Sequence, residues 1–250
     1  MLEKFSTLDC IAPVFMMLLW QGYSLAADHR HRSGSRSVTA VTHDYRVLWM
    51  RRMLEREMRM GDVNICVAMS RSASLFASTS IFIMAGLITL FGALGQINAI
   101  LRDISFVAGP ERLLIEVNLV LLVLIFVFAF FKFVWSTRQF NFALTLIGGA
   151  PMPDEPDAPD RVGFSERTAS VIDRATNSFT QGLRAYYFAL ATLTWVVHPG
   201  VFMFASVVVL GVLYRREFRS HTHRFLMEAG ANLASETLKN RPETDKKDKI

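Results

Sequence analysis

The side chains that could carry chemistry are few and widely spaced. Two His-x-His pairs occur, His29 with His31 and His221 with His223. Side chains two residues apart point to opposite sides of a helix, and both pairs lie in basic segments that would repel a metal cation. The sequence contains no His-Glu-x-x-His, Gly-x-Ser-x-Gly or Cys-x-x-Cys motif. We therefore expect no metal site and no cofactor, and the sequence favours a non-enzymatic protein.

Three polar residues stand inside otherwise apolar stretches: Glu116, Asn118 and His198. An ionisable group within a membrane span marks an ion path or an intramembrane pair, and broken helices often line binding cavities. These residues are therefore a candidate intramembrane polar site. The alternative is structural: Glu116 reaches towards lipid headgroups, and His198 bonds to backbone groups that Pro199 leaves unpaired.

A second candidate set combines cationic, amide and aromatic side chains at the ends of apolar stretches. Such a set suits the phosphate of a lipid headgroup or the surface of an acidic partner. Its members are Arg46, Trp49, Arg52, Lys132, Arg138, Asn141, Arg184 and Tyr187. The alternative is that these cations only fix the orientation of the chain in the membrane.

The elements that must position these residues are apolar and unusually free of charge. Hydrophobic residues make up 52% of the 250 residues, and 20 of them are phenylalanine. Charge-free stretches long enough to cross a membrane separate Asp9 from Asp28, Arg71 from Arg102, Glu116 from Lys132, and Arg184 from Arg215. This pattern excludes a soluble enzyme, a disulfide scaffold and a disordered chain.

The charge and the cysteines agree with an integral membrane protein. Most of the arginines behind the net charge of +5 flank the apolar stretches, so anionic lipid is a nearer partner than nucleic acid, and we expect no nucleic-acid binding. The two cysteines, Cys10 and Cys66, are expected near opposite membrane faces, which excludes a disulfide between them.

We predict an all-α, multi-pass membrane helix bundle with about four transmembrane helices. The spans are expected at about 8–26, 72–97, 113–135 and 185–214, within a single membrane domain over 1–220. Ser74 and Ser78, four residues apart at the start of the second span, are expected to allow close helix packing. Residues 221–250 are expected to form a polar, partly disordered tail.

The fourth stretch is the awkward one, because it is too long for one simple span and too short for two. His198-Pro199-Gly200 lies at its centre, where proline removes a helical hydrogen bond and predicts a kink or break. Tyr187 and Tyr214 are about 40 Å apart along a helix, which matches the distance between the two headgroup zones. One kinked crossing is therefore the prediction, with a re-entrant hairpin as the alternative.

The two alternatives differ in where they place the C-terminal tail. The segment 28–71 is rich in arginine, so the positive-inside rule puts it in the cytoplasm and the N-terminus outside. Four crossings then put the tail outside as well. Arg215, Arg216, Arg219 and Arg224 favour the cytoplasm instead, and the hairpin would remove this conflict.

Two helices are expected outside the spans, on the cytoplasmic side. Residues 41–60 contain neither proline nor glycine, and place Tyr45, Leu48 and Trp49 close together among several arginines. Such a helix lies on anionic lipid or on a partner, or else covers the end of the bundle. Residues 164–183 carry apolar side chains at helical spacing after an acidic, proline-rich linker. We expect that helix to lie on the membrane or against the first one.

Several segments together resemble the membrane protein family known as domain of unknown function 599. They are Arg46-Val-Leu-Trp49-Met50, Ser74-Leu-Phe-Ala-Ser78-Thr79-Ser80, Lys132-Phe-Val-Trp135-Ser136-Thr-Arg138-Gln139-Phe-Asn141, Gly148-Gly-Ala-Pro151, Arg184-Ala-Tyr186-Tyr187-Phe-Ala-Leu-Ala and Leu213-Tyr214-Arg215-Arg216-Glu217-Phe218. The resemblance implies a multi-span protein of bacterial membranes, and so a place in the inner membrane. It carries no established activity or ligand.

Two classes of function remain. The first is a non-enzymatic helical bundle that presents a basic cytoplasmic surface to anionic lipid or to a protein partner, including another copy of itself. The second is an oligomeric transporter or channel for ions or small molecules, with its site near His198 and Glu116.

Overall fold

The computed structural model describes residues 7–32, 38–96, 112–155 and 160–218, and these fold into helices without a β-strand. The helices are α1 (Thr7–Arg32), α2 (Val38–Leu54), α3 (Met60–Gly92), α5 (Arg112–Gly148), α6 (Arg161–Leu193), the 3-10 turn η1 (Thr194–Val196) and α7 (Pro199–Phe218). The predicted all-α bundle is thus confirmed. The two His-x-His pairs and the tail 221–250 give no side-chain detail, since they lie outside the described side chains.

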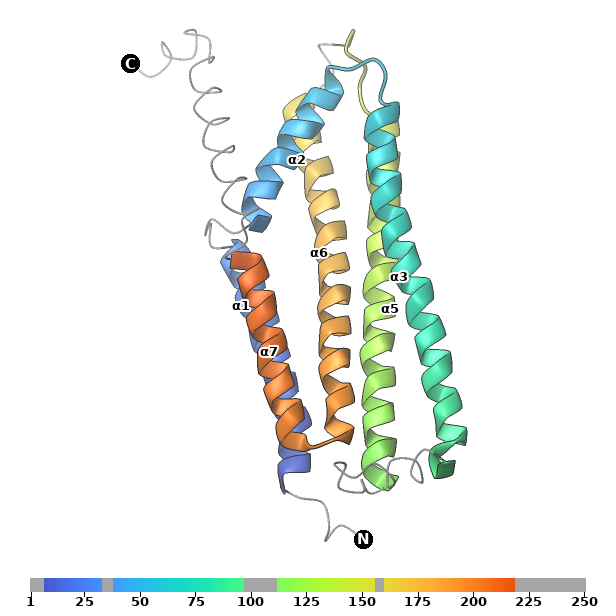
Figure 1. Cartoon of the computed structure of the whole chain (residues 1–250). Helices are drawn as coiled ribbons and strands as arrows, with labels where there is room; N and C mark the ends of the chain where they lie inside the picture. The colour runs from blue at the N-terminus through green and yellow to red at the C-terminus, as the bar shows by residue number, and fades with distance from the viewer. Residues whose placement is uncertain (1–6, 33–37, 97–111, 156–159, 219–250) are drawn as a thin grey trace, which may run out of the picture.

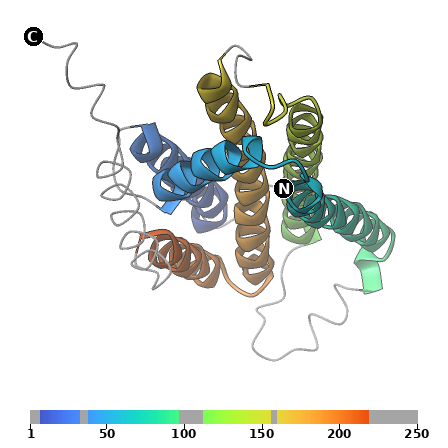
Figure 2. The same ribbon diagram turned by 90° about the horizontal axis from the view of Figure 1, so that it is seen from above.

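The long helices α5 and α6 form an antiparallel pair at the centre of the molecule (Figure 1). Helix α3 packs against α5, whereas α1 and α7 pack against each other and against α6. Helix α2 crosses the end of α6 at the top of Figure 1, and the view from above shows it lying over the bundle (Figure 2). Both termini of the described chain are therefore parts of long helices that contact α6.

Two hydrophobic cores are stacked along these helices. The lower bundle, residues 7–25, 72–96, 113–135 and 183–214, contains one core with Trp20, Leu122, Phe133, Phe188 and Phe202 among its buried side chains. The upper bundle, residues 38–71 and 136–182, contains the other, which α2 closes with Met50 and Met53. Since α3, α5 and α6 run through both bundles, the two cores are joined by continuous helices.

The outer surface of the lower bundle is apolar, as expected for contact with lipid. Apart from Met58, Met60, Ile65, Phe142 and Met152, every exposed large apolar side chain of the described residues lies in the lower bundle. Within the described part of the chain, three helical segments are long and apolar enough to cross a membrane: Met60–Gly92, Leu113–Gly148 and Pro199–Arg216. A shorter apolar stretch, Ile11–Leu25, lies in α1. The chain therefore has the character of a multi-pass membrane protein.

The fourth apolar stretch does not form one kinked crossing. Helix α6 ends at Leu193, a short 3-10 turn follows, and α7 begins at Pro199. The predicted break at His198-Pro199-Gly200 is thus confirmed, but α7 runs back antiparallel to α6 (Figure 1). Residues 185–193 are the last turns of a helix that begins at Arg161, which is why the stretch was too long for one span and too short for two.

The loop helices also differ from the prediction in their limits. The expected helix 41–60 is α2, which begins at Val38 and ends at Leu54, and Met60 already belongs to α3. The expected helix 164–183 is the first part of α6 and packs against α2. The predicted spans 72–97 and 113–135 are parts of the longer helices α3 and α5. Side chains that pack in the upper bundle extend these helices beyond their lipid-facing lengths.

Helix α6 begins at a left-handed residue, Asp160, with φ of 61°. Aspartate tolerates this conformation better than most residues, and its carboxylate accepts a hydrogen bond from the Gly163 amide at 2.9 Å. Hydrogen bonds from Arg167 and from Gly163 lower the pKa of Asp160 below its ordinary value. This cap therefore favours the folded state above the unfolded pKa of the group, and its contribution is lost as the pH falls through the lowered value.

Helices α5 and α6 are in tight contact at Gly182, where the two bundles meet. A Cβ atom on Gly182 would lie 2.6 Å from the Phe133 ring, which is fully buried and part of an aromatic cluster with Phe76, Phe179 and Tyr186. Below this cluster the core is mostly apolar, with Asn118, Thr192 and Ser206 among its few buried polar side chains. Just above it, Ser136 donates to the Ala175 carbonyl at 2.7 Å and fixes the register of α5 against α6.

Gly182→Ala should destabilise the fold by about 1–3 kcal/mol, because the added methyl group forces the buried Phe133 ring to move. Gly86→Ala is the matched control, since a Cβ there meets nothing within 4 Å. Thermal unfolding in detergent measures both. Equal melting temperatures for the two variants would contradict the close contact.

The antiparallel course of α7 predicts the side of the tail. A reporter enzyme fused after Phe218 should be active on the same side as one inserted between α1 and α2, and opposite to one inserted between α3 and α5. We expect the first two in the cytoplasm, because both adjoin arginine-rich segments. A fusion after Phe218 that reported the opposite side from the α1–α2 insertion would contradict this arrangement.

Candidate functional site

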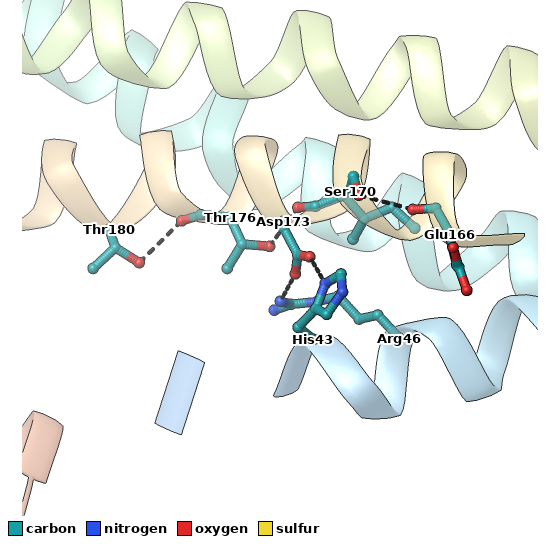
Figure 3. A network of polar contacts seen from close by, with 8 residues as sticks. His43, Arg46, Glu166, Ser170, Asp173, Thr176 and Thr180 are labelled. Carbon is teal, nitrogen blue, oxygen red and sulfur yellow. Dashed lines mark hydrogen bonds and ion pairs between the residues drawn. The ribbon is translucent and has the colours of Figure 1, made fainter. Parts of the chain in front are cut away.

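The polar contacts of the upper bundle centre on α2 and α6. Asp173 of α6 accepts a hydrogen bond from Arg46 of α2 and is paired with His43, also of α2 (Figure 3). The side chains of Arg46 and Asp173 are only 14% and 12% exposed. Arg46, predicted as an anion contact, is therefore engaged within the protein, and Asp173 is its anionic partner.

A second carboxylate holds the other end of α2 against α3. Asp62, buried in the first turn of α3, accepts hydrogen bonds from Trp49 Nε1 at 2.6 Å and from Arg56 at 2.7 Å. Trp49 is thus also committed to an internal contact. Helix α2 is therefore held to α6 by the Arg46–Asp173 ion pair and to α3 by the Trp49 indole, and Arg56, just beyond its end, adds a charged contact to Asp62.

Three further arginines of this region also bind protein groups. Arg59 donates to the Ala150 carbonyl at 2.7 Å, and Arg161 donates to the Leu54 carbonyl at 2.7 Å. Arg51 forms an exposed pair with Glu166 at 3.3 Å. Arg52, the other predicted contact on α2, is exposed. The arginine-rich loop therefore serves largely to hold the upper bundle together.

A different group of cations lies where the lower bundle meets the upper one. The Phe76 and Phe133 rings stack with centroids 5.3 Å apart, so these residues mark one level of α3 and α5. Arg71 and Arg138 are each five residues above that level, about 7.5 Å along a helix, and both are exposed. Arg215 and Arg216 end α7 on the same side, after Tyr214 (Figure 1). We call Arg71, Arg138, Arg215 and Arg216 the basic belt.

Aromatic side chains hold some of these cations. The Arg138 guanidinium lies 5.8 Å from the centroid of Trp135 and 5.6 Å from that of Phe142, and Asn141 is exposed beside it. The Lys132 ammonium lies 5.2 Å from the Phe128 centroid, and therefore points down the helix towards its N-terminus rather than up to Arg138. Cation–π contacts of this kind orient a cation without neutralising it.

Two predicted contacts lie between α6 and its neighbours α1 and α7. Arg184 is only 4% exposed, and its guanidinium lies 5.0 Å from the Tyr23 ring centroid. The Tyr187 hydroxyl accepts a hydrogen bond from Arg216 at 2.9 Å. Arg184 thus ties α6 to α1 inside the bundle, whereas the Tyr187 contact joins α6 to the exposed end of α7.

The three residues of the predicted intramembrane polar site differ in their burial. His198 is exposed, and its Nδ1 accepts a hydrogen bond from the Gly200 amide at 3.0 Å at the start of α7. Asn118 is 2% exposed in the lower core, and its Oδ1 has no hydrogen-bond partner among the described residues. Glu116 is half-buried on the same helix. His198 therefore caps a helix at the surface, and Asn118 is the buried member of the set.

The packed face of α3 is carried by residues next to the predicted serines. Ser74 and Ser78 are exposed, whereas Ala73, Ala77 and Ser80 are buried. The Ser80 hydroxyl lies 3.0 Å from the Tyr186 hydroxyl of α6. Alanine and serine at positions 73, 77 and 80 thus allow the close approach that the sequence assigned to Ser74 and Ser78, and the latter two lie on the outer face.

Comparison with protein-family models matches residues 11–222 to the family described as protein of unknown function, DUF599. The chain belongs to this family. No curated protein and no solved structure matches it. The match extends from α1 to just beyond α7, so both bundles of this DUF599 chain are part of the family unit, and neither is an appended domain.

Sequence reasoning about this DUF599 chain missed its two anchoring carboxylates, Asp62 and Asp173. Asp173 follows Ile172, one of the apolar positions that marked the buried face of the 164–183 segment. An acidic residue at the edge of such a face could have indicated an anchoring carboxylate, because the chain has an arginine-rich helix elsewhere. It names no partner, because the pairing depends on how α2 lies across α6.

Asp173→Asn should loosen α2, because Arg46 would lose a charged hydrogen bond of roughly 2–3 kcal/mol in a poorly solvated position. Glu166→Gln, which removes the exposed pair with Arg51, should cost less than about 1 kcal/mol. Hydrogen exchange of the α2 amides in detergent distinguishes them. We expect faster exchange over Val38–Leu54 in Asp173→Asn only, and equal protection in both variants would contradict an anchoring role.

Proposed function

We propose that this protein is a non-enzymatic membrane helix bundle whose basic belt binds anionic lipid headgroups at the cytoplasmic face. The observation that carries the proposal is the position of the belt. Arg71 follows the upper part of α3 just before its apolar stretch, Arg138 follows Trp135 on α5, and Arg215 follows Tyr214 on α7. On three helices an exposed arginine thus stands at the place where the lipid-facing surface ends.

Charge and surroundings support this role. The lower bundle, below the belt, contains few charges. Within its residues 7–25, 72–96, 113–135 and 183–214 the charged side chains are Asp9, Glu116, Lys132 and Arg184. A guanidinium at the headgroup level forms charge-assisted hydrogen bonds with phosphate, and each basic side chain near an anionic surface contributes about 1 kcal/mol. The belt lies on the arginine-rich side, which the positive-inside rule assigns to the cytoplasm. We propose the bacterial inner membrane as its location.

The upper bundle is suited to a second role, as a surface for a protein partner. Its arginines are largely paired, and its exposed apolar side chains include Met58, Met60 and Met152. Flexible methionines are common at protein-binding surfaces. Lipid binding through the belt arginines and partner binding through these methionines therefore use different residues and do not compete.

Transport through a site at Glu116 and His198 has weaker support. The His198 ring accepts a hydrogen bond from its own turn and is exposed, so its position is explained by the start of α7. Asn118 is the residue that favours this alternative, since buried amide groups normally have partners. One buried amide does not make a path across the bundle.

Native mass spectrometry of the purified protein tests the proposal. The protein should retain more phosphatidylglycerol than phosphatidylethanolamine, and a variant with all four belt arginines changed to glutamine should lose most of this preference. A variant with Arg52→Gln and Arg167→Gln is the control, because it removes two exposed arginines of the upper bundle. Equal loss in both variants, or no preference in the parent, would contradict the proposal.

A further inference from the structure

The outer face of α5 carries a continuous strip that none of the described helices covers. Exposed apolar side chains follow one another at intervals of three or four residues, which places them on one face of a helix. From the far end towards the upper bundle they are Leu113, Val117, Val120, Leu124, Phe128, Phe131 and Trp135. The 22 steps from Leu113 to Trp135 rise about 33 Å along the helix, close to the roughly 30 Å of a bilayer core.

The same spacing continues into a polar end. Arg138 is three residues beyond Trp135, and Phe142 is four residues beyond Arg138, so the guanidinium lies on the strip between two aromatic rings. Asn141 is exposed at the adjoining position. The strip therefore ends in a cation and an amide, both able to donate hydrogen bonds, at the level where lipid phosphates lie.

The charge of this end is uncompensated along the helix. Residues 117–148 of α5 contain Lys132 and Arg138 and no aspartate or glutamate. The guanidinium of Arg138 is also restrained, because stacking against Trp135 and Phe142 limits its rotamers. A restrained donor loses less conformational entropy on binding than a mobile one. Arg71 on α3 lies at the same level, five residues above the stacked Phe76 and Phe133 rings. The two aromatic contacts of the guanidinium distinguish Arg138 from it.

We propose that the outer face of α5 is a binding site for one anionic phospholipid. Its phosphate is held by the Arg138 guanidinium and the Asn141 amide, and an acyl chain lies along Trp135, Phe131 and Leu124. The Lys132 ammonium, directed down the helix over Phe128, adds positive charge beneath the headgroup. This site rests on the proposed function, since it is one defined position within the basic belt.

Fluorescence quenching by lipids with brominated acyl chains tests the site directly. The protein is reconstituted in vesicles of phosphatidylglycerol and phosphatidylcholine at equal mole fraction, with bromine on one lipid or on the other. The Trp135 side chain is exposed on the outer face of α5, whereas Trp20 and Trp195 are buried. The difference between the parent and Trp135→Phe gives the signal of Trp135 alone.

We expect brominated phosphatidylglycerol to occupy the position beside Trp135 about fivefold more often than brominated phosphatidylcholine, which corresponds to one basic side chain near the surface. Arg138→Gln should reduce that ratio to about one. Arg71→Gln, the matched change at the same level of α3, should leave it unchanged. Excess inorganic phosphate should leave the ratio unchanged. If phosphate lowered the ratio to one, the site would bind soluble phosphate and the lipid assignment would be wrong.

The outcomes separate this site from the belt as a whole. A ratio near one in the parent protein, together with retained phosphatidylglycerol preference in native mass spectrometry, would overturn the site and leave the belt in place. Loss of the ratio in both Arg138→Gln and Arg71→Gln would replace a defined site with diffuse attraction. If native mass spectrometry showed no preference for phosphatidylglycerol, the proposed function of the belt would be wrong, and the site on α5 would be wrong with it.

Discussion

The close contact of α5 with α6 is the interaction on which the rest of the structure depends. Gly182 allows the two backbones to approach across the Phe133 ring, and the Ser136 hydroxyl fixes their register one turn higher. Both helices are much longer than a bilayer core is thick. This one contact therefore supports both hydrophobic cores, that of the apolar lower bundle and that of the upper bundle. The remaining helices pack against this pair, α3 on α5, and α1, α2 and α7 on α6.

Arginine serves two purposes in this fold, and its surroundings decide which. Arg46 on α2 lies against Asp173, and Arg56, just after α2, lies against Asp62, so charge adds to the buried methionines in holding α2 in place. At the boundary of the two bundles, Arg71 and Arg138 are exposed and meet no described carboxylate in an ion pair within 4 Å. The paired arginines stabilise the fold, whereas Arg71 and Arg138 leave their guanidinium groups exposed at the level proposed for lipid phosphate.

Much of the fold could be predicted because its cause is local. The absence of charge over about 20 residues marks a lipid-facing helix whatever its neighbours, and Pro199 marks a break because the ring itself removes a donor. The course of residues 185–214 could not be predicted in this way. Whether a broken apolar stretch continues or turns back depends on whether α1 and α6 offer a surface for α7, which local sequence does not encode.

The sequence by itself determined that the chain is an all-α, multi-pass membrane protein of the DUF599 family, with cations at the ends of its apolar helices. The tertiary structure alone decided which cations remain exposed. Arg46 and Arg184 were predicted as contacts for anions, but packing places one against Asp173 and buries the other over Tyr23. Arg138 kept its predicted place on the surface. The reason is physical: composition sets how much charge a segment carries, whereas solvation and pairing depend on which helices pack beside it.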